Sequence, residues 1–138
     1  MARVTGIGGV FLRARDPKAL TEWYATHLGI KPTEHGVSFI WSECAEPEGA
    51  GQGMTAWSLF PADTKYFGPS TQQAMVNYRV DDLDALLDQL RAAAVEIDPK
   101  REDYDYGRFA WIVDPEGNRV ELWQPLPLSD EQRDEFLK

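Results

Sequence analysis

Cysteine, histidine and long apolar runs are all scarce in this sequence. The single cysteine, Cys44, cannot form an internal disulfide, which favours a cytoplasmic setting. No run approaches the roughly 18 apolar residues of a transmembrane helix, and the N-terminus lacks the pattern of a signal peptide. The two histidines, His27 and His35, are expected at a helix end and in a loop, without catalytic roles. These absences predict a cytoplasmic domain with no membrane span.

Positive charge is also in short supply. Lys and Arg number 14 against 23 Asp and Glu, which gives a formal net charge of −9 and a pI near 4.6. A protein that binds phosphate backbones normally presents a basic patch, and none is visible here. Nucleic acid is therefore not an expected partner. The length of 138 residues and the hydrophobic content of 43% suffice for one compact domain with its own core.

Secondary-structure signals occur in the same order in each half of the chain. In the first half, residues 7–15 alternate as a strand, and Asp16 and Pro17 then mark the start of a helix over 17–28 that Gly29 ends. Two more strands are predicted, with a glycine-rich loop between them and a longer connection after them. The strands cover 37–42 and 54–60, the loop 46–53 and the connection 61–73.

The second half repeats this plan. Residues 75–80 alternate as a strand, and an amphipathic helix follows the capping residue Asp82. A loop is predicted over 101–107, followed by a hairpin across the turn sequence DPEG. The hairpin strands cover 109–113 and 118–124. A capping-box pattern predicts a short terminal helix over about 129–138.

A shift of 66 residues superposes the two halves, placing Asp16 on Asp82 and Leu20 on Leu86. One face of the strands in each half is apolar and suits the helix, whereas the other face is mixed. The mixed face carries Gly9, Phe11 and Arg13 in the first half, and Met75, Asn77, Arg79, Arg119, Glu121 and Trp123 in the second. Apolar walls with a few polar groups are typical of a ligand cavity, so Glu121 is expected to point into one. The alternative is a solvent-facing sheet in which Glu121 pairs with an arginine.

Three segments resemble the vicinal oxygen chelate superfamily, which includes glyoxalase I, extradiol dioxygenases, fosfomycin resistance enzymes and bleomycin-binding proteins. They are GGVFLRARDPKALTEWYATHLGI, VNYRVDDLDALLDQLRAA and FAWIVDPEGNRVELWQP, and the resemblance covers about residues 5–125. It implies an α+β fold of two βαβββ modules that form a half-barrel with a concave cavity and helices on the outer face. The modules would span about 5–66 and about 72–125 of a single domain, 1–138. It also implies a homodimer.

The resemblance implies a role for Glu121, because in metal-dependent members the glutamate of the last strand is a metal ligand. The other ligand positions correspond here to Gly9, Met75 and Ser58, or to Trp57 if the register slips by one. Gly9 has no side chain, Met75 offers a soft thioether and Ser58 is a weak ligand. Glu121 is thus the only retained candidate ligand, and a divalent ion needs several oxygen or nitrogen donors. We expect no cofactor, with a divalent metal as the alternative.

Three functions remain open. The first is a glyoxalase-like or bleomycin-resistance-like protein that binds a small organic molecule, aromatic or anionic, in a cavity without the family metal centre. Glu121 would then anchor the ligand or transfer a proton as acid or base. The alternatives are a metal-dependent lyase, isomerase or dioxygenase that uses Glu121, and a non-catalytic dimeric interaction or regulatory protein. The predicted ligand-binding residues are Phe11, Arg13, Trp57, Ser58, Asn77, Arg79, Tyr106, Trp111, Arg119 and Trp123.

Overall fold

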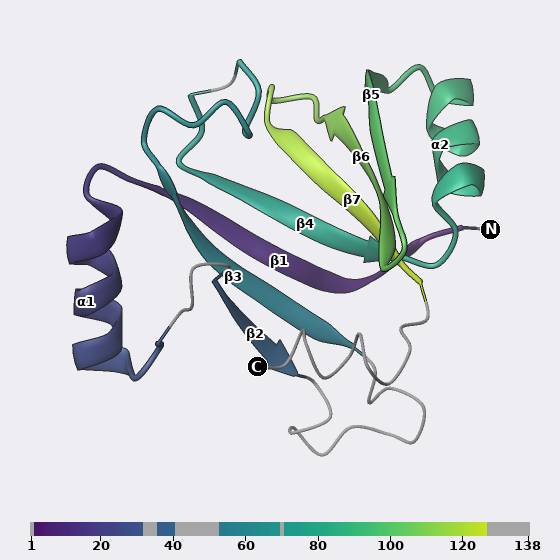
Figure 1. Cartoon of the computed structure of the whole chain (residues 1–138). Helices are drawn as coiled ribbons and strands as arrows, with labels where there is room; N and C mark the ends of the chain where they lie inside the picture. Colours follow the sequence, from purple (N-terminus) through teal and green to yellow (C-terminus); the bar gives the residue numbers. More distant parts are fainter. Residues whose placement is uncertain (1, 32–35, 41–52, 70, 127–138) are drawn as a thin grey trace. The chain divides into compact units, whose positions relative to one another are not determined.

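The computed structural model describes residues 2–31, 36–40, 53–69 and 71–126. Over these residues the chain forms strands and helices of an α+β fold with a mixed sheet, as predicted (Figure 1). The elements are β1 (Val4–Ala14), α1 (Pro17–Leu28), β2 (Val37–Ile40), β3 (Met54–Pro61), β4 (Ala74–Val80), α2 (Leu83–Ala92), β5 (Glu96–Tyr104), β6 (Gly107–Val113) and β7 (Arg119–Pro125). Neither helix has the length or apolar character needed to cross a bilayer. The predicted terminal helix, residues 46–52 of the predicted loop, His35 and Cys44 lie outside the described residues.

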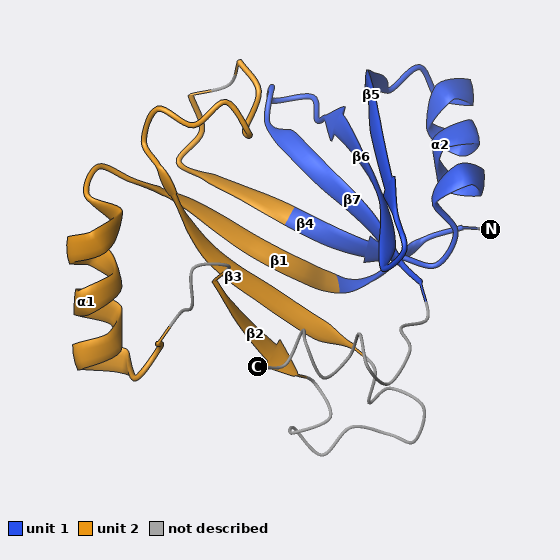
Figure 2. Cartoon of the chain, in the orientation of Figure 1, with its two compact units in different colours: residues 1–6, 77–138 blue, residues 7–76 orange. Residues whose placement is uncertain are grey.

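The strand order in the 7-stranded sheet is β2-β3-β1-β4-β7-β6-β5. β1 pairs parallel with β3, and β4 pairs parallel with β7, whereas β2–β3, β5–β6 and β6–β7 pair antiparallel. The chain divides into two compact units, which Figure 2 colours separately: unit 2 is residues 7–76, and unit 1 is residues 1–6 with 77–138. Unit 2 holds α1, β2, β3 and most of β1, and unit 1 holds α2, β5, β6, β7 and most of β4. The module limits given by the resemblance stay a prediction.

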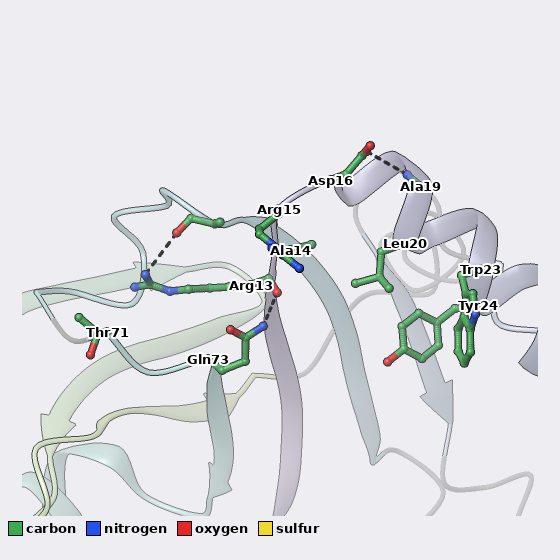
Figure 3. Close-up of a pocket in the computed structure, with 11 residues that line it drawn as sticks. Arg13, Ala14, Arg15, Asp16, Ala19, Leu20, Trp23, Tyr24, Thr71 and Gln73 are labelled. Carbon is green, nitrogen blue, oxygen red and sulfur yellow. Dashed lines mark hydrogen bonds between the residues drawn. The ribbon is translucent and has the colours of Figure 1, made fainter.

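Both helices begin where the repeat predicts. The Asp16 carboxylate accepts a hydrogen bond from the Ala19 amide at 3.1 Å (Figure 3), and the Asp82 carboxylate accepts one from the Ala85 amide at 3.1 Å. Helix α1 ends at Gly29, which has the left-handed φ of 70° expected of a terminal glycine. Such a cap contributes about 1 kcal/mol, so each helix start is set by its local sequence.

Helix α1 packs less than its sequence predicts. Its apolar stripe should lie on the sheet of unit 2, yet no α1 residue is buried, and Trp23 and Leu28 are 50% and 61% exposed. The Tyr24 ring meets the Trp57 ring of β3 edge-on, with ring centroids 4.8 Å apart. This contact joins two bulky rings, and Leu20 is half-buried, whereas Trp23 and Leu28 stay largely uncovered by the described residues. The helix is therefore formed as predicted, while its full burial is not observed.

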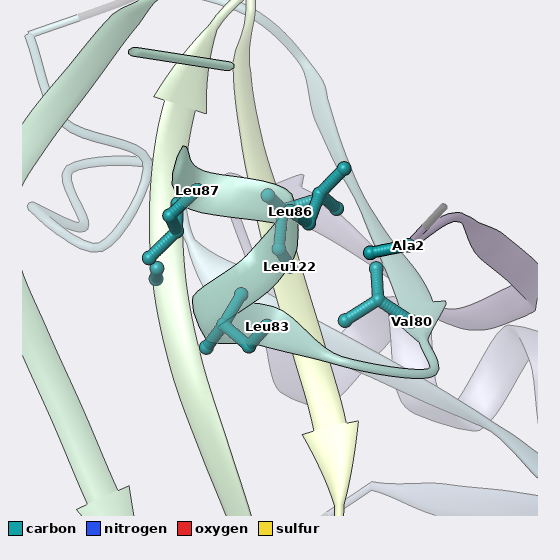
Figure 4. Close-up of a cluster of buried hydrophobic side chains, with 7 residues drawn as sticks. Ala2, Val80, Leu83, Leu86, Leu87 and Leu122 are labelled. Atoms are coloured by element: carbon teal, nitrogen blue, oxygen red, sulfur yellow. The ribbon is translucent and has the colours of Figure 1, made fainter. Parts of the chain in front are cut away.

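Helix α2 shows the packing that α1 lacks. Leu83, Leu86 and Leu87 are buried within unit 1 and form a core with neighbouring apolar side chains (Figure 4). The other buried members of this core are Ala2, Val80, Ala110 and Leu122. Val80 and Leu122 belong to the apolar faces predicted for β4 and β7, so in unit 1 the helix-facing side of the sheet is confirmed.

The polar segment 101–107, predicted as a loop, is mostly strand. β5 pairs with β6 as far as Tyr104 opposite Gly107, which leaves only residues 105–106 for the turn. β5 is the last strand in the order, and its side chains form ion pairs such as Arg101 with Asp103, at 3.1 Å. Edge strands commonly carry charges, because one side of the strand faces water. Composition alone therefore gave the wrong prediction here.

The turn sequence DPEG joins β6 to β7 as predicted. The Gly117 amide donates to the Asp114 carbonyl at 3.0 Å, and Gly117 takes a φ of 84°, which suits glycine. The Asp114 carboxylate also accepts from the Asn118 amide at 2.9 Å. The register that follows places Trp111 directly opposite Glu121.

Candidate functional site

Glu121 lies on β7 between two strands that both donate hydrogen bonds to it. Register places Asn77 of β4 on one side and Trp111 of β6 on the other. Asn77 Nδ2 donates to Glu121 Oε2 at 2.6 Å, and Trp111 Nε1 donates to Glu121 Oε1 at 3.0 Å. Glu121 is 1% exposed and Asn77 is 3% exposed. Glu121 is therefore a buried carboxylate with a donor for each oxygen, and the solvent-facing alternative is wrong.

Arg119, on the same face of β7, forms a salt bridge with Asp98 of β5. Arg119 Nη1 lies 2.6 Å from Asp98 Oδ2, with the side chains 11% and 26% exposed. The guanidinium carbon of Arg119 lies 5.2 Å from the Trp111 ring centroid, and Lys100 Nζ lies 5.4 Å from it. Cations over an indole ring are attracted to its π-electrons and polarise them, which strengthens the ring N–H as a donor. Arg119 and Lys100 thus support the hydrogen bond from Trp111 to Glu121.

The Asp98–Arg119 pair predicts a pH effect on stability. The hydrogen bond from Arg119 holds the pKa of Asp98 below the ordinary aspartate value of 3.8. Because the folded-state pKa is lowered, this contribution is complete above the unfolded-state pKa and is lost as pH falls through the folded-state pKa. Asp98→Asn should therefore destabilise the protein by about 1 kcal/mol at neutral pH and by less below about pH 3. Urea unfolding of both proteins at the two pH values measures this, and an equal difference at both would contradict it.

Aromatic rings continue this face toward the β5–β6 turn. Phe109 and Trp123 stack with centroids 6.2 Å apart and planes 8° apart, and the Tyr106 ring lies edge-on to Phe109 at 6.1 Å. Burial, and the negative charges of Glu102 and Glu121, raise the pKa of Tyr106. The Tyr106 phenol therefore stays protonated at neutral pH.

Two buried polar atoms on this face lack a hydrogen-bond partner within the described part of the chain: Asn77 Oδ1 and Trp123 Nε1. Buried polar atoms without partners are rare and call for a specific explanation, such as a water or a ligand. Trp123 Nε1 lies so close to Gly107 that a side chain there would overlap the indole. We refer to Asn77, Trp111, Arg119, Glu121 and Trp123 as the Glu121 cluster.

In unit 2, the counterparts of Asn77 and Glu121 also lie opposite each other on paired strands. Phe11 of β1 lies opposite Ser58 of β3, and Asn77 lies opposite Glu121. The 66-residue shift superposes Phe11 on Asn77. Ser58 is therefore the counterpart of Glu121, and the register assigns Ser58 rather than Trp57 to this position. Trp57 lies on the other face of β3, against α1.

The two arginines at matching positions have different surroundings. Arg13 Nη1 donates to the Ala62 carbonyl at 3.3 Å, and its guanidinium carbon lies 4.9 Å from the centroid of the buried Phe67 ring. Arg79 lies on β4, where its backbone carbonyl accepts from the Thr5 hydroxyl at 3.3 Å. The structure thus brings Asn77, Trp111, Arg119 and Glu121 together in unit 1, and it places Arg13 among aromatic rings of unit 2.

The positions that the resemblance assigns to metal ligands do not supply a suitable donor set. Gly9 has no side chain, and a Cβ there would lie 3.0 Å from the Phe11 ring. Met75 is fully buried and offers only a thioether, whereas Ser58 offers a neutral hydroxyl. Within the described ranges, no three His, Cys, Asp or Glu side chains come together as a metal site. One carboxylate together with residues of these types does not fit a divalent ion, which prefers several oxygen or nitrogen ligands.

Sequence reasoning does not find Asp98 and Lys100. They lie in β5, where Pro99 and the break in register between Ile97 and Arg101 obscure the alternation of a strand. Their connection to Trp111 depends on β5 pairing with β6, which a loop prediction for 101–107 removes. The charge alternation of Asp98, Lys100 and Glu102 was the available signal.

Taken together, the fold is an α+β arrangement with a mixed sheet and a buried glutamate on its last strand. The family model for the Glyoxalase/Bleomycin resistance protein/Dioxygenase superfamily matches residues 6–122, and the chain belongs to this superfamily. This confirms the family inferred from the three sequence segments. The comparison with curated protein sequences finds no match.

Solved structures share this fold. A methylmalonyl-CoA epimerase from Mycobacterium tuberculosis is 25% identical, with a TM-score of 0.55 and coverage of 90% of each chain. A variant of the Streptomyces coelicolor methylmalonyl-CoA epimerase in complex with 2-nitronate-propionyl-CoA is 16% identical, with a TM-score of 0.63 and coverage of 93% of this chain and 99% of that one. A superfamily member from Vibrio splendidus is 12% identical, with a TM-score of 0.51 and coverage of 90% and 99%.

Proposed function

We propose that this chain binds a small organic molecule at the Glu121 cluster, without a divalent metal centre. The observation that carries the proposal is a buried carboxylate on the same face of the sheet as two buried polar atoms that lack hydrogen-bond partners in the described residues. These atoms are Asn77 Oδ1 and Trp123 Nε1. A ligand or water that supplied the missing partners would remove the free-energy penalty of leaving them unpaired, about 1–3 kcal/mol for each atom. Superfamily membership supports a small-molecule ligand in general terms.

Glu121 is proposed to anchor this ligand or to transfer a proton. Its carboxylate is held in one orientation by Asn77 and Trp111, so little conformational freedom is lost when a ligand binds. A positioned carboxylate can accept a ligand N–H or O–H group, and it can act as acid or base within hydrogen-bond reach. The stacked rings of Phe109 and Trp123 favour a ligand with a planar aromatic part.

The absence of a metal centre is part of the proposal and rests on donor chemistry. Met75 and Ser58 are poor ligands for the hard cations that carboxylates favour. Both oxygens of Glu121 already accept hydrogen bonds from N–H groups. Each oxygen keeps a further lone pair, but the other family positions supply no strong donor that would hold a metal ion there.

Metal content and ligand binding together test the proposed function. Protein purified without chelators is analysed for metals and titrated calorimetrically with Zn, Mn, Ni and Fe(II). We expect neither stoichiometric metal nor saturable uptake. Stoichiometric metal that is lost in Glu121→Gln would overturn the proposal and favour a metal-dependent lyase, isomerase or dioxygenase.

Ligand binding is then measured with a panel of planar aromatic compounds that differ in charge, through quenching of the 5 tryptophans. We expect saturable binding that Glu121→Gln weakens about tenfold, because one charged acceptor is lost. Glu116→Gln, in the exposed β6–β7 turn, removes the same charge away from the cluster and is the matched control. Binding equal in both variants, or none across the panel, would contradict the proposal.

We also propose that the protein is a homodimer and that it is cytoplasmic. The first proposal derives from the superfamily resemblance and the second from the composition. Sedimentation equilibrium at several protein concentrations measures the mass, and a monomer throughout would contradict the homodimer.

A further inference from the structure

A second feature of unit 2 lies apart from the Glu121 cluster. A cavity of about 1150 Å³ opens between the C-terminal end of β1 and the first turns of α1. Next to it, α1 contacts the sheet through the ring pair of Tyr24 and Trp57, and no residue of α1 is fully buried. No residue of the cavity was among the predicted ligand-binding residues except Arg13.

The wall of the cavity that α1 forms is apolar and aromatic. Leu20 and Tyr24 extend from α1 toward the strands, and Ala14 lies at the end of β1 (Figure 3). Trp23 stands beside Tyr24 with ring centroids 5.1 Å apart and is half exposed. A half-exposed tryptophan next to a tyrosine offers a large flat contact area that loses little conformational entropy on binding.

The other wall carries polar groups. Gln73 is fixed against β1, because its Nε2 donates to the Arg13 carbonyl at 2.6 Å and its own carbonyl accepts from the Arg13 amide at 2.9 Å. Thr71 also lines the cavity. These groups can orient a polar substituent at the edge of a bound ring.

Two arginines line the cavity. The guanidinium of Arg13 is held by the Ala62 carbonyl and the Phe67 ring, so the cation left for a ligand is Arg15. It is exposed, and in the described ranges its side chain has no hydrogen bond or ion pair. The neighbouring Asp16 carboxylate is occupied as the cap of α1, where it accepts from Ala19. In a chain of net charge −9, a guanidinium without a partner in the described ranges, in a cavity that aromatic rings also line, marks a local site for an anion.

We infer that the cavity between β1 and α1 is a second binding site, which takes a flat organic anion with its ring against Trp23 and Tyr24 and its acidic group at Arg15. This site is independent of the proposed function, because the residues that form it do not belong to the Glu121 cluster. Two fused aromatic rings with one sulfonate or carboxylate match this site, because the rings can lie on the aromatic wall and the acidic group can pair with Arg15.

Titration with naphthalene-2-sulfonate, followed by ¹H–¹⁵N spectra of the tryptophan indoles, tests the inference. The Trp23 signal is assigned by its loss in Trp23→Phe. We expect this signal to shift saturably, and Arg15→Gln to weaken binding about tenfold. Lys18→Gln removes an exposed cation from the same helix but outside the cavity and should leave the affinity unchanged.

Further measurements test the charge of the ligand and the location of the proposed site separately. The neutral analogue 2-naphthalenemethanol should bind about tenfold more weakly than the sulfonate. Equal affinity for both compounds, equal effects of Arg15→Gln and Lys18→Gln, or shifts confined to indoles other than that of Trp23 would each overturn the inference. Thermal unfolding of every variant identifies a loss of fold, and Trp23→Ala, in which the wall is removed, should abolish binding by a folded protein.

Discussion

Replacing Asn77 with aspartate should destabilise the protein strongly at about pH 8 and much less at about pH 4. The Asn77 amide lies 2.6 Å from a carboxylate oxygen of Glu121, and both residues are buried. The substitution removes this hydrogen bond and places a second carboxylate beside the first. An uncompensated buried charge of this kind costs about 3–5 kcal/mol. The effect should exceed that of any substitution on the exposed surface.

The direction of the pH effect follows from how the two carboxylates share a proton. In the folded variant, repulsion raises the higher of the pair's two pKa values above the unfolded values of about 3.9 and 4.3. The destabilisation is therefore smallest near pH 4, where the pair shares one proton, and it grows as pH rises through the raised folded-state pKa. Urea unfolding across this range measures the slope.

Asn77→Leu is the matched control, because it removes the hydrogen bond without adding a charge. It should cost about 1–3 kcal/mol, with a weaker dependence on pH than the aspartate variant, because one donor to the carboxylate is lost and no second carboxylate is added. If the aspartate and leucine variants show the same pH profile, the contact between residues 77 and 121 does not have the geometry described here.

The candidate site was predictable as far as strand alternation and the hairpin register could be inferred. Alternation places Arg119, Glu121 and Trp123 on one face of β7, and the DPEG turn places Trp111 opposite Glu121. The neighbour across the parallel strand, Asn77, depends on a pairing between β4 and β7 that are far apart in sequence. The sequence therefore predicts on which face of its strand Asn77 lies, because alternation is a local property. It does not predict the hydrogen bond from Asn77 to Glu121, because that bond depends on tertiary pairing of the strands.

The fold shows the same division between local and tertiary information. Both helix starts follow from an aspartate cap, which acts within four residues, and both were predicted correctly. Whether a helix then packs depends on the surface it meets. At positions 66 residues apart, α1 has Tyr24 where α2 has Leu90, and its ring meets Trp57 edge-on. The side-chain pattern alone predicts the same packing for both helices. The contact between the Tyr24 and Trp57 rings is what distinguishes α1 from α2.

That difference leads to the second large effect, in which Leu86→Ala should cost far more stability than Leu20→Ala. The two leucines are equivalent under the repeat. Leu86 is buried in the core of unit 1, whereas Leu20 is partly exposed on the cavity wall of unit 2. Removing a buried leucine side chain typically costs about 2–5 kcal/mol, because its packing is lost and a void remains.

Leu20→Ala should cost under about 1 kcal/mol, because much of the side chain already faces an open cavity and no closed void forms. Urea unfolding at neutral pH, followed by circular dichroism, compares the two variants with the parent protein. Leu28→Ala, at an α1 position that is 61% exposed, sets the lower limit of the scale. Equal losses for Leu86→Ala and Leu20→Ala would mean that α1 is packed as firmly as α2, and the cavity beside β1 would then be closed in solution. A large difference would establish α1 as the less firmly packed helix, with room for a ligand between it and the sheet of its own unit.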